Sequence, residues 1–143
     1  MAKNILLILG HPSKNSFNKA LLDAYQTGAE STGANCKTIY ISDLHFDVNL
    51  ADGYKTGKAD QLEEDLIAAQ KLFQWADHVV MAFPNWCGAM PAITKGFIDR
   101  LFLPGFAFKN HSGKTFPEQL LKGKSMRVLV TMDTPKFWFY LVH

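Results

Sequence analysis

Four short runs of apolar, β-branched or aromatic residues, separated by stretches with helical spacing, constrain the fold of this chain more than any other feature. The runs cover residues 4–9, 36–41, 78–83 and 126–131. Each is too short for a membrane span, and buried strands have this length and these polar, glycine or proline boundaries. Between the runs, apolar residues recur at helical spacing over residues 15–31, 60–76 and 91–101. The alternation predicts an α/β fold with a doubly wound parallel sheet and helices on both faces.

Composition excludes several classes of protein. The chain has 143 residues, 48% of them apolar and 20% charged, with a formal net charge of +2. We therefore expect one domain over residues 1–143 that binds no nucleic acid, since no basic stripe is present. Cys36 and Cys87 lack metal-ligand spacing, which favours free thiols, no metal site and a reducing compartment. We expect a cytoplasmic protein without membrane insertion.

Spacing also excludes familiar phosphate-binding and hydrolytic motifs. A dinucleotide-binding fingerprint needs three glycines after the first strand, and only Gly10 is there. The segments 53–59 and 108–115 both depart from the P-loop pattern. No nucleophile-elbow or zinc-protease motif occurs.

The loop from Gly10 to Asn18 could bind an anion. It contains His11, Ser13, Asn15 and Ser16 and leads into a helix. Free backbone N–H groups at a helix start attract phosphate. The same residues would equally make an ordinary helix cap, and spacing alone leaves both interpretations open.

A second loop, 83–92, follows the third strand. Two prolines stiffen it, Gly88 lets its backbone turn, and Asn85 and Trp86 could face a planar heterocycle. Trp86 could equally pack under the next helix. Ligands of doubly wound sheets lie beyond the carboxyl ends of the strands, so 10–18, 84–91 and the segment from Thr131 onward are the candidates.

Taken together, these segments resemble the NAD(P)H:quinone oxidoreductase family of the flavodoxin-like fold. The resemblance is carried by Gly-His-Pro-Ser-Lys-Asn-Ser-Phe-Asn at 10–18, by the stretch 83–100 and by Leu-Pro-Gly-Phe-Ala-Phe at 103–108. It implies that the first loop holds the flavin phosphates through His11, Ser16, Phe17 and Asn18. The second loop would lie along the flavin ring with Pro84, Asn85, Trp86 and Cys87. The turn after the fourth strand would close over the other side with Thr131, Met132, Asp133 and Thr134.

The resemblance implies a flavin-dependent NAD(P)H oxidoreductase. In such enzymes NAD(P)H gives a hydride to flavin N5, and a quinone or similar acceptor then receives it in ping-pong order. The flavin, FAD or FMN, carries the chemistry, so no catalytic side chain is expected. A homodimer with its site at the subunit interface is implied, in which Trp86, Phe106 and Phe108 contact the acceptor; Phe108 is as easily a core residue.

Departures from the family pattern bring other possibilities. Cys87 stands where other members often have an aromatic residue, and Thr-Met-Asp-Thr-Pro replaces a Thr-Thr-Gly-Gly turn at 131–135. The family also continues with a further strand and helix, so we expect the sheet order 2-1-3-4 without a fifth edge strand, and a marginal or aggregation-prone product. The alternatives are a flavin-binding accessory subunit of the potassium-efflux type and a truncated remnant that binds no cofactor.

Overall fold

The main sheet is parallel and has four strands. The computed structural model describes residues 2–51, 53, 62–113, 115–135, 137 and 141. The sheet order is β2-β1-β3-β6, formed by β1 (Asn4–Leu9), β2 (Asn35–Tyr40), β3 (His78–Pro84) and β6 (Ser125–Thr131). Since β4 and β5 pair apart from this sheet, β6 is its fourth strand and the predicted order is confirmed.

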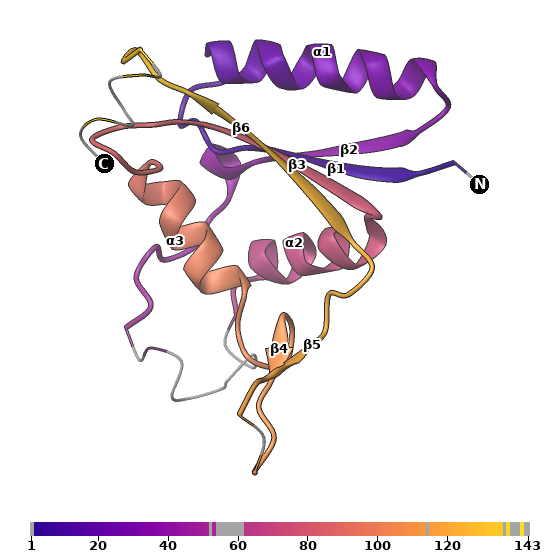
Figure 1. Ribbon diagram of the computed structural model, residues 1–143, viewed down its shortest axis with the longest axis vertical. Coiled ribbons are helices and arrows are strands. Elements are labelled where there is room, and N and C mark those ends of the chain that lie inside the picture. The colour runs from indigo at the N-terminus through magenta and orange to yellow at the C-terminus, as the bar shows by residue number, and fades with distance from the viewer. Residues whose placement is uncertain are drawn as a thin grey trace.

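Helices cover both faces of the sheet, as predicted. Figure 1 shows α1 (Phe17–Ser31) on one face, with α2 (Glu64–Trp75) and α3 (Ala92–Leu101) on the other. A short 3-10 turn, η1 (Ile41–Asp43), follows β2. The helices begin later than predicted because Ser16, Glu63 and Pro91 are cap residues rather than first-turn residues.

The core lies on both sides of β1 and β3. Successive side chains of a strand point to opposite faces. Accordingly Leu6 and Ile8 pack toward α2 and α3, whereas Leu7 and Leu9 pack toward α1. All four are fully buried, and each contributes roughly 1.5–3 kcal/mol of hydrophobic stabilisation.

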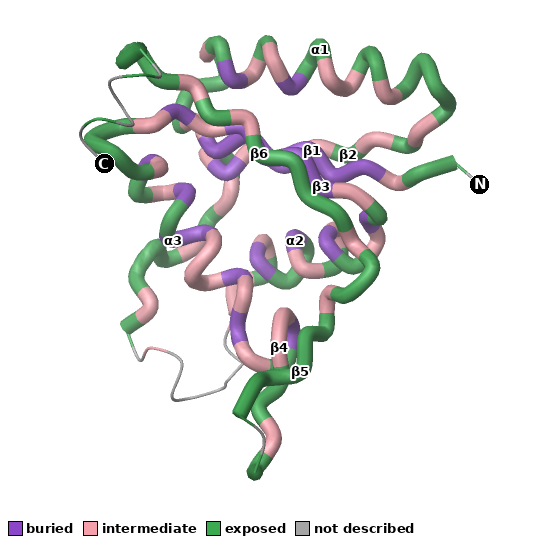
Figure 2. Tube along the Cα trace, in the orientation of Figure 1, coloured by how far each residue is buried: buried purple, intermediate pink, exposed green. Residues whose placement is uncertain are grey.

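Strand β6 differs from its neighbours, because one of its faces is bare. Met126, Val128 and Val130 are 50%, 48% and 45% exposed. In Figure 2 most of β6 is drawn as exposed, while β1 and β3 are largely buried. Among the described residues, β3 is the sheet neighbour of β6.

A small hairpin that the sequence did not predict lies between α3 and β6. Its strands, β4 (Phe108–Lys109) and β5 (Glu118–Gln119), have two residues each and pair antiparallel. Strands this short leave no period-2 pattern to detect. In the predicted connection 43–58, only residues 43–51 and 53 are described. The guanidinium of Arg100 in α3 donates to the Asp47 and Asn49 carbonyls and holds part of this segment.

No helix in the described ranges is both long and apolar enough to cross a membrane.

Candidate functional site

Three segments distant in sequence meet at the carboxyl ends of the strands. The Asn85 amide donates to the Thr131 carbonyl at 2.7 Å, and the Thr131 hydroxyl donates to Asn18 Oδ1 at 3.1 Å. Figure 1 shows the start of α1, the loop after β3 and the end of β6 on the same side of the sheet. The structure thus brings together the three segments that the sequence singled out.

The first loop ends in a capped helix. Ser16 is the N-cap of α1, with its Oγ accepting from the Lys19 amide at 3.3 Å. The first N–H groups of a helix have no partner within it, and those that the Ser16 cap does not occupy remain available to an anion. Phe17, at the first helical position, is 69% exposed.

Asn18 is buried beside this helix start with half of its amide unsatisfied. Its side chain is 2% exposed, and Oδ1 accepts from Thr131. Its Nδ2 has no hydrogen-bond partner within the described part of the chain. An unsatisfied buried donor costs about 1–3 kcal/mol, which a bound acceptor would recover. Asn18 is therefore a donor without an acceptor at a helix N-terminus.

His11 has a fixed orientation in the first loop. Its Nδ1 lies 2.9 Å from the Ser13 amide nitrogen and 3.1 Å from the Ser13 carbonyl oxygen. The shorter contact makes Nδ1 the acceptor, which leaves the proton of a neutral imidazole on Nε2. His11 can therefore donate from Nε2 to a ligand.

The second loop makes a tight turn. Trp86 and Ala89 exchange backbone hydrogen bonds of 2.8 and 3.0 Å, and Cys87 and Gly88 between them have φ angles of 51° and 80°. Two consecutive positive φ angles are typical of a type I′ turn, in which a non-glycine residue is strained. The turn leaves Trp86 48% exposed. Its ring stands edge-on to that of His11, with 5.5 Å between centroids, so the two loops touch and Trp86 is not packed under α3.

Thr94, which the motifs of the sequence did not single out, supports the first loop from the side of α3. Its hydroxyl, fully buried in α3, donates to the Gly10 carbonyl at 2.6 Å. A β-carbon at Gly10 would lie 2.9 Å from Thr94 Oγ1 and from Phe83 Cβ. Gly10 is thus needed for close packing, and no motif of the sequence indicates this contact.

The remaining predicted site residues are more dispersed. Pro84 is buried and Cys87 exposed, Met132 is 37% exposed, and Asp133 and Thr134 are exposed after β6. Phe106 is 7% exposed and packs in the core near Phe102, and Phe108 is half-buried. Phe108 belongs to β4 and Phe106 lies between α3 and β4 in sequence; Figure 1 shows β4 beyond the far end of α3, away from the strand ends. Within one copy, the structure does not bring them to the other site residues.

Cationic side chains flank the start of α1. Lys14 forms an ion pair with Asp43 at 2.5 Å, and Lys19 forms one with Asp23 at 2.6 Å. Both ammonium groups also lie over the Tyr40 ring, 4.9 and 5.7 Å from its centroid. The hydrogen bond with Asp23 raises the pKa of Lys19, which stays protonated. Among the described residues, no group of three or more His, Cys, Asp or Glu side chains could hold a metal ion.

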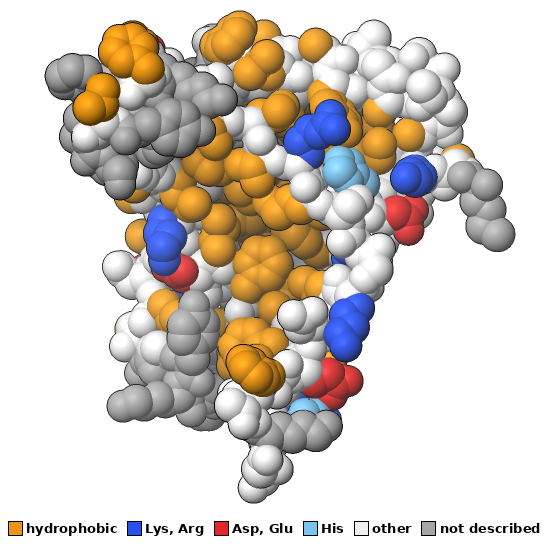
Figure 3. Space-filling view, viewed as in Figure 1, with side chains coloured by type: hydrophobic (Ala, Val, Ile, Leu, Met, Phe, Trp, Pro, Cys, Tyr) orange, Lys and Arg blue, Asp and Glu red, His pale blue; other side chains and the backbone are white. Residues whose placement is uncertain are grey.

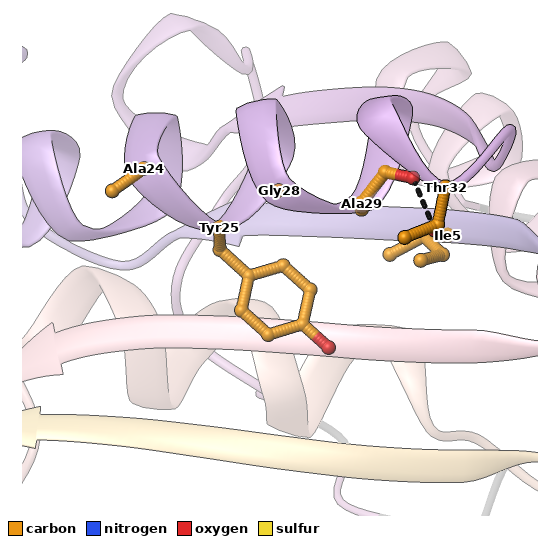
Figure 4. Close-up of a pocket in the computed structure, with 6 residues that line it drawn as sticks. All are labelled: Ile5, Ala24, Tyr25, Gly28, Ala29 and Thr32. Atoms are coloured by element: carbon orange, nitrogen blue, oxygen red, sulfur yellow. Dashed lines mark hydrogen bonds between the residues drawn. The ribbon is translucent and has the colours of Figure 1, made fainter.

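A hollow of about 370 Å³ lies elsewhere, at the second half of α1 and the start of β1. Figure 4 shows the Tyr25 ring reaching from α1 toward the strands, and Thr32 bonded to the Ala29 carbonyl. The lining is mostly apolar and lies near the amino ends of the strands, so we do not assign it to the candidate site. It is lined by Ile5, Ala24, Tyr25, Gly28, Ala29 and Thr32.

Known proteins place this arrangement in a family. Residues 3–141 match a family described as having the flavodoxin-like fold, and the chain belongs to that family. The protein Smu.1420 from Streptococcus mutans has a solved structure that is 33% identical, with a TM-score of 0.80 over 98% of this chain and 73% of the other.

Curated relatives carry names from oxidoreductase chemistry. An uncharacterized NAD(P)H oxidoreductase of Haemophilus influenzae is 28% identical over 92% of this chain and 65% of its own length. A ribosyldihydronicotinamide dehydrogenase [quinone] of Rattus norvegicus is 30% identical over 74% of this chain and 54% of its own. These names confirm the resemblance to the NAD(P)H:quinone oxidoreductase family. The chain spans between half and two thirds of the length of these two relatives.

Proposed function

We propose that this chain binds a flavin by its phosphate at the 10–18 loop and acts as an NAD(P)H-dependent flavin oxidoreductase. The observation that carries the proposal is Asn18 Nδ2, a buried donor without a partner in the described part of the chain, at the start of α1. A phosphate oxygen is the kind of acceptor that both this donor and the helix N-terminus favour.

Other residues would hold the rest of the cofactor. His11 would add a donor from Nε2, Ser16 would keep the helix start in place, and Phe17 would cover the phosphate from solvent. Pro84, Asn85, Trp86 and Cys87 would lie along the flavin ring, and the segment 131–134 would close its other side. The hydrogen bonds of Thr131 to Asn85 and Asn18 support a fixed spacing between these parts.

Two-electron transfer from NAD(P)H to a quinone or similar acceptor, in ping-pong order, is the chemistry that a flavin supplies when bound. The protein's part is to orient the ring and its partners. Trp86, half exposed beside His11, would present an apolar surface to the acceptor. Phe106 and Phe108 could contribute only from a second copy, so we propose a homodimer. A cytoplasmic location is part of the same proposal. The family resemblance supports FMN and FAD equally.

Replacing Asn18 by Asp tests the phosphate site. Asn18→Asp keeps an acceptor for Thr131 but replaces the unpaired donor with a negative charge. We expect the affinity for FMN or FAD, measured by quenching of flavin fluorescence on titration into apo-protein, to fall at least tenfold, or about 1.5–3 kcal/mol. Inorganic phosphate should compete with flavin in the parent protein and not in the variant.

The control is Asn35→Asp, which makes the same charge change at an exposed position at the opposite end of the sheet. It should leave flavin affinity unchanged. Equal affinities for the parent and Asn18→Asp would refute the site. Tight flavin binding without turnover of NAD(P)H would instead favour the accessory-subunit function, for which the bare apolar face of β6 gives a docking surface.

A further inference from the structure

Buried polar side chains are rare in the described part of the chain, and they gather at the candidate site. Asn18 and Thr94 are the two polar residues that are buried there, at 2% and 0% exposed. On the face shown in Figure 3, hydrophobic side chains fill the middle and charged side chains lie around them. Buried polar groups need hydrogen-bond partners, and each of these two side chains bonds to a segment of the candidate site, Asn18 to Thr131 and Thr94 to Gly10.

The hydrogen bond of Thr94 has a fixed direction. A carbonyl oxygen can only accept, so the Thr94 hydroxyl is the donor to Gly10 at 2.6 Å. Threonine hydroxyls in helices often bond to a carbonyl of the preceding turn. Thr94 lies in the first turn of α3, yet its hydroxyl bonds 84 positions away, while its amide bonds to the Pro91 carbonyl at 2.9 Å. The hydroxyl therefore serves the first loop and not its own helix.

Gly10 is held from two sides where the chain leaves β1. Its amide donates to the Ala82 carbonyl of β3 at 2.8 Å, and its carbonyl accepts from Thr94. The peptide bond that follows Gly10 is trans and planar, so with its carbonyl directed at α3 the amide N–H of His11 points the opposite way. The Thr94 bond thus fixes the orientation in which the chain enters the loop 10–18.

The same bond joins the bases of the first and second loops. The second loop leads into α3 at its cap residue Pro91, three positions before Thr94. The two loops meet again at the rings of His11 and Trp86, whose centroids are 5.5 Å apart. The spacing of the loops is therefore set by a buried hydrogen bond at the base and by an exposed ring contact further out.

We propose that Thr94 is a positioning residue, which sets the first loop, and with it His11, relative to the second loop. The consequence for the ligand rests on the function proposed above. In that function the first loop would bind the flavin phosphate and the second would lie along the ring. FMN would then engage both loops, whereas riboflavin, which has no phosphate, would engage the second alone. Thr94 therefore contributes to the selection of FMN over riboflavin.

Substitutions at position 94 isolate the hydroxyl. Thr94→Val keeps the shape of the side chain and removes the donor, whereas Thr94→Ser keeps the donor and removes the methyl group. We expect Thr94→Val to weaken FMN binding about fivefold or more, measured by quenching of flavin fluorescence on titration into apo-protein, because the Gly10 carbonyl loses its buried donor. Riboflavin affinity should stay the same, and Thr94→Ser should restore FMN binding.

The matched control is Thr27→Val, which removes an exposed hydroxyl that donates to the Asp23 carbonyl within α1 at 3.0 Å. It should leave the affinities for FMN and riboflavin unchanged. A purely structural role of Thr94 would lower the urea midpoint of Thr94→Val and leave the FMN affinity of the folded protein as it was. That result, or equal losses for FMN and riboflavin, would overturn the proposal.

Proton NMR of the flavin-free protein tests the positioning separately from the proposed function. The edge-on rings of His11 and Trp86 should give a nuclear Overhauser effect in the parent, lose it in Thr94→Val and keep it in Thr94→Ser. An effect that is absent from the parent, or unchanged in Thr94→Val, would overturn the proposal. A parent that shows the effect and binds no flavin would refute the proposed function alone. If Thr94→Val fails to fold, Thr94→Ala compared with Thr94→Ser tests the same hydroxyl.

Discussion

Asn18 and Thr131 show how a single hydrogen bond can assemble a site. They are 113 positions apart in sequence, and their contact at 3.1 Å joins the start of α1 to the end of β6. The bond occupies the oxygen of the Asn18 amide and leaves the nitrogen free. The Asn18 side chain thus has two roles: its oxygen makes a structural contact, and its nitrogen is a donor available to a ligand.

Cys87 stores strain in the turn beside the site. Its φ of 51° lies in the left-handed region, where Asn is far better tolerated than Cys. We expect Cys87→Asn to stabilise the protein by about 0.5–1 kcal/mol in urea unfolding. Cys87→Ala removes the thiol but keeps the strained β-carbon, so it should bring no such gain. Equal gains for both variants would mean that the thiol, not the backbone, is unfavourable.

His78 makes stability depend on pH at the other end of the sheet. Burial, with the positive charges of Arg127 and Lys3, lowers the pKa of its imidazole. Its nitrogens lie 2.7 Å from Ser125 Oγ and 3.2 Å from the Tyr25 hydroxyl. On acidification the unfolded chain takes up the proton first, near its ordinary pKa of about 6.5, so folding stability falls as the pH drops below that value.

The variant His78→Gln cannot take up this proton. We expect its unfolding free energy to fall less than that of the parent between about pH 7 and pH 5, measured by urea unfolding at each pH. Parallel pH profiles for the two proteins would show that His78 titrates alike in the folded and unfolded states.

At the scale of elements, α3 is held close to the segment after η1. A β-carbon at Gly96 would lie 2.7 Å from both Cβ and the carbonyl oxygen of Val48. Gly96→Ala should therefore destabilise the protein by about 1–3 kcal/mol. Gly28, inside α1, has open space around its α-carbon, and Gly28→Ala should stabilise by about 0.5–1 kcal/mol. Urea unfolding of both variants measures this difference, and the same sign for both would contradict the close approach.

The sequence predicted elements best where burial repeats along the chain. The central strands are continuous apolar runs because both their faces are covered, and α1 to α3 carry a helical period, so their existence was predictable. The β4–β5 hairpin was missed because two-residue exposed strands have no period. The three loops of the site were predictable from strand order, since parallel strands end at one edge. The free Asn18 nitrogen and the Thr94 bond depend on packing between distant segments, which one sequence does not reveal.

At the scale of the whole molecule, the buried core and the candidate site occupy different parts of the sheet: the core lies along the central strands, and the site lies at their carboxyl ends. Strands β1 and β3 are covered on both faces and lead into the first two loops, whereas β6 contributes Thr131 to the candidate site and has β3 as its sheet neighbour among the described residues. The site is built almost wholly from loops that a rigid sheet positions, as is usual for this class of fold.

The visible spectrum of the purified protein tests the central claim most directly. The protein is prepared without added cofactor, incubated with FMN or FAD, freed of unbound flavin, and then given NADPH and a quinone in turn without oxygen. We predict bound flavin absorbance that bleaches with NADPH and returns with the quinone. A colourless protein that takes up neither flavin would contradict the account.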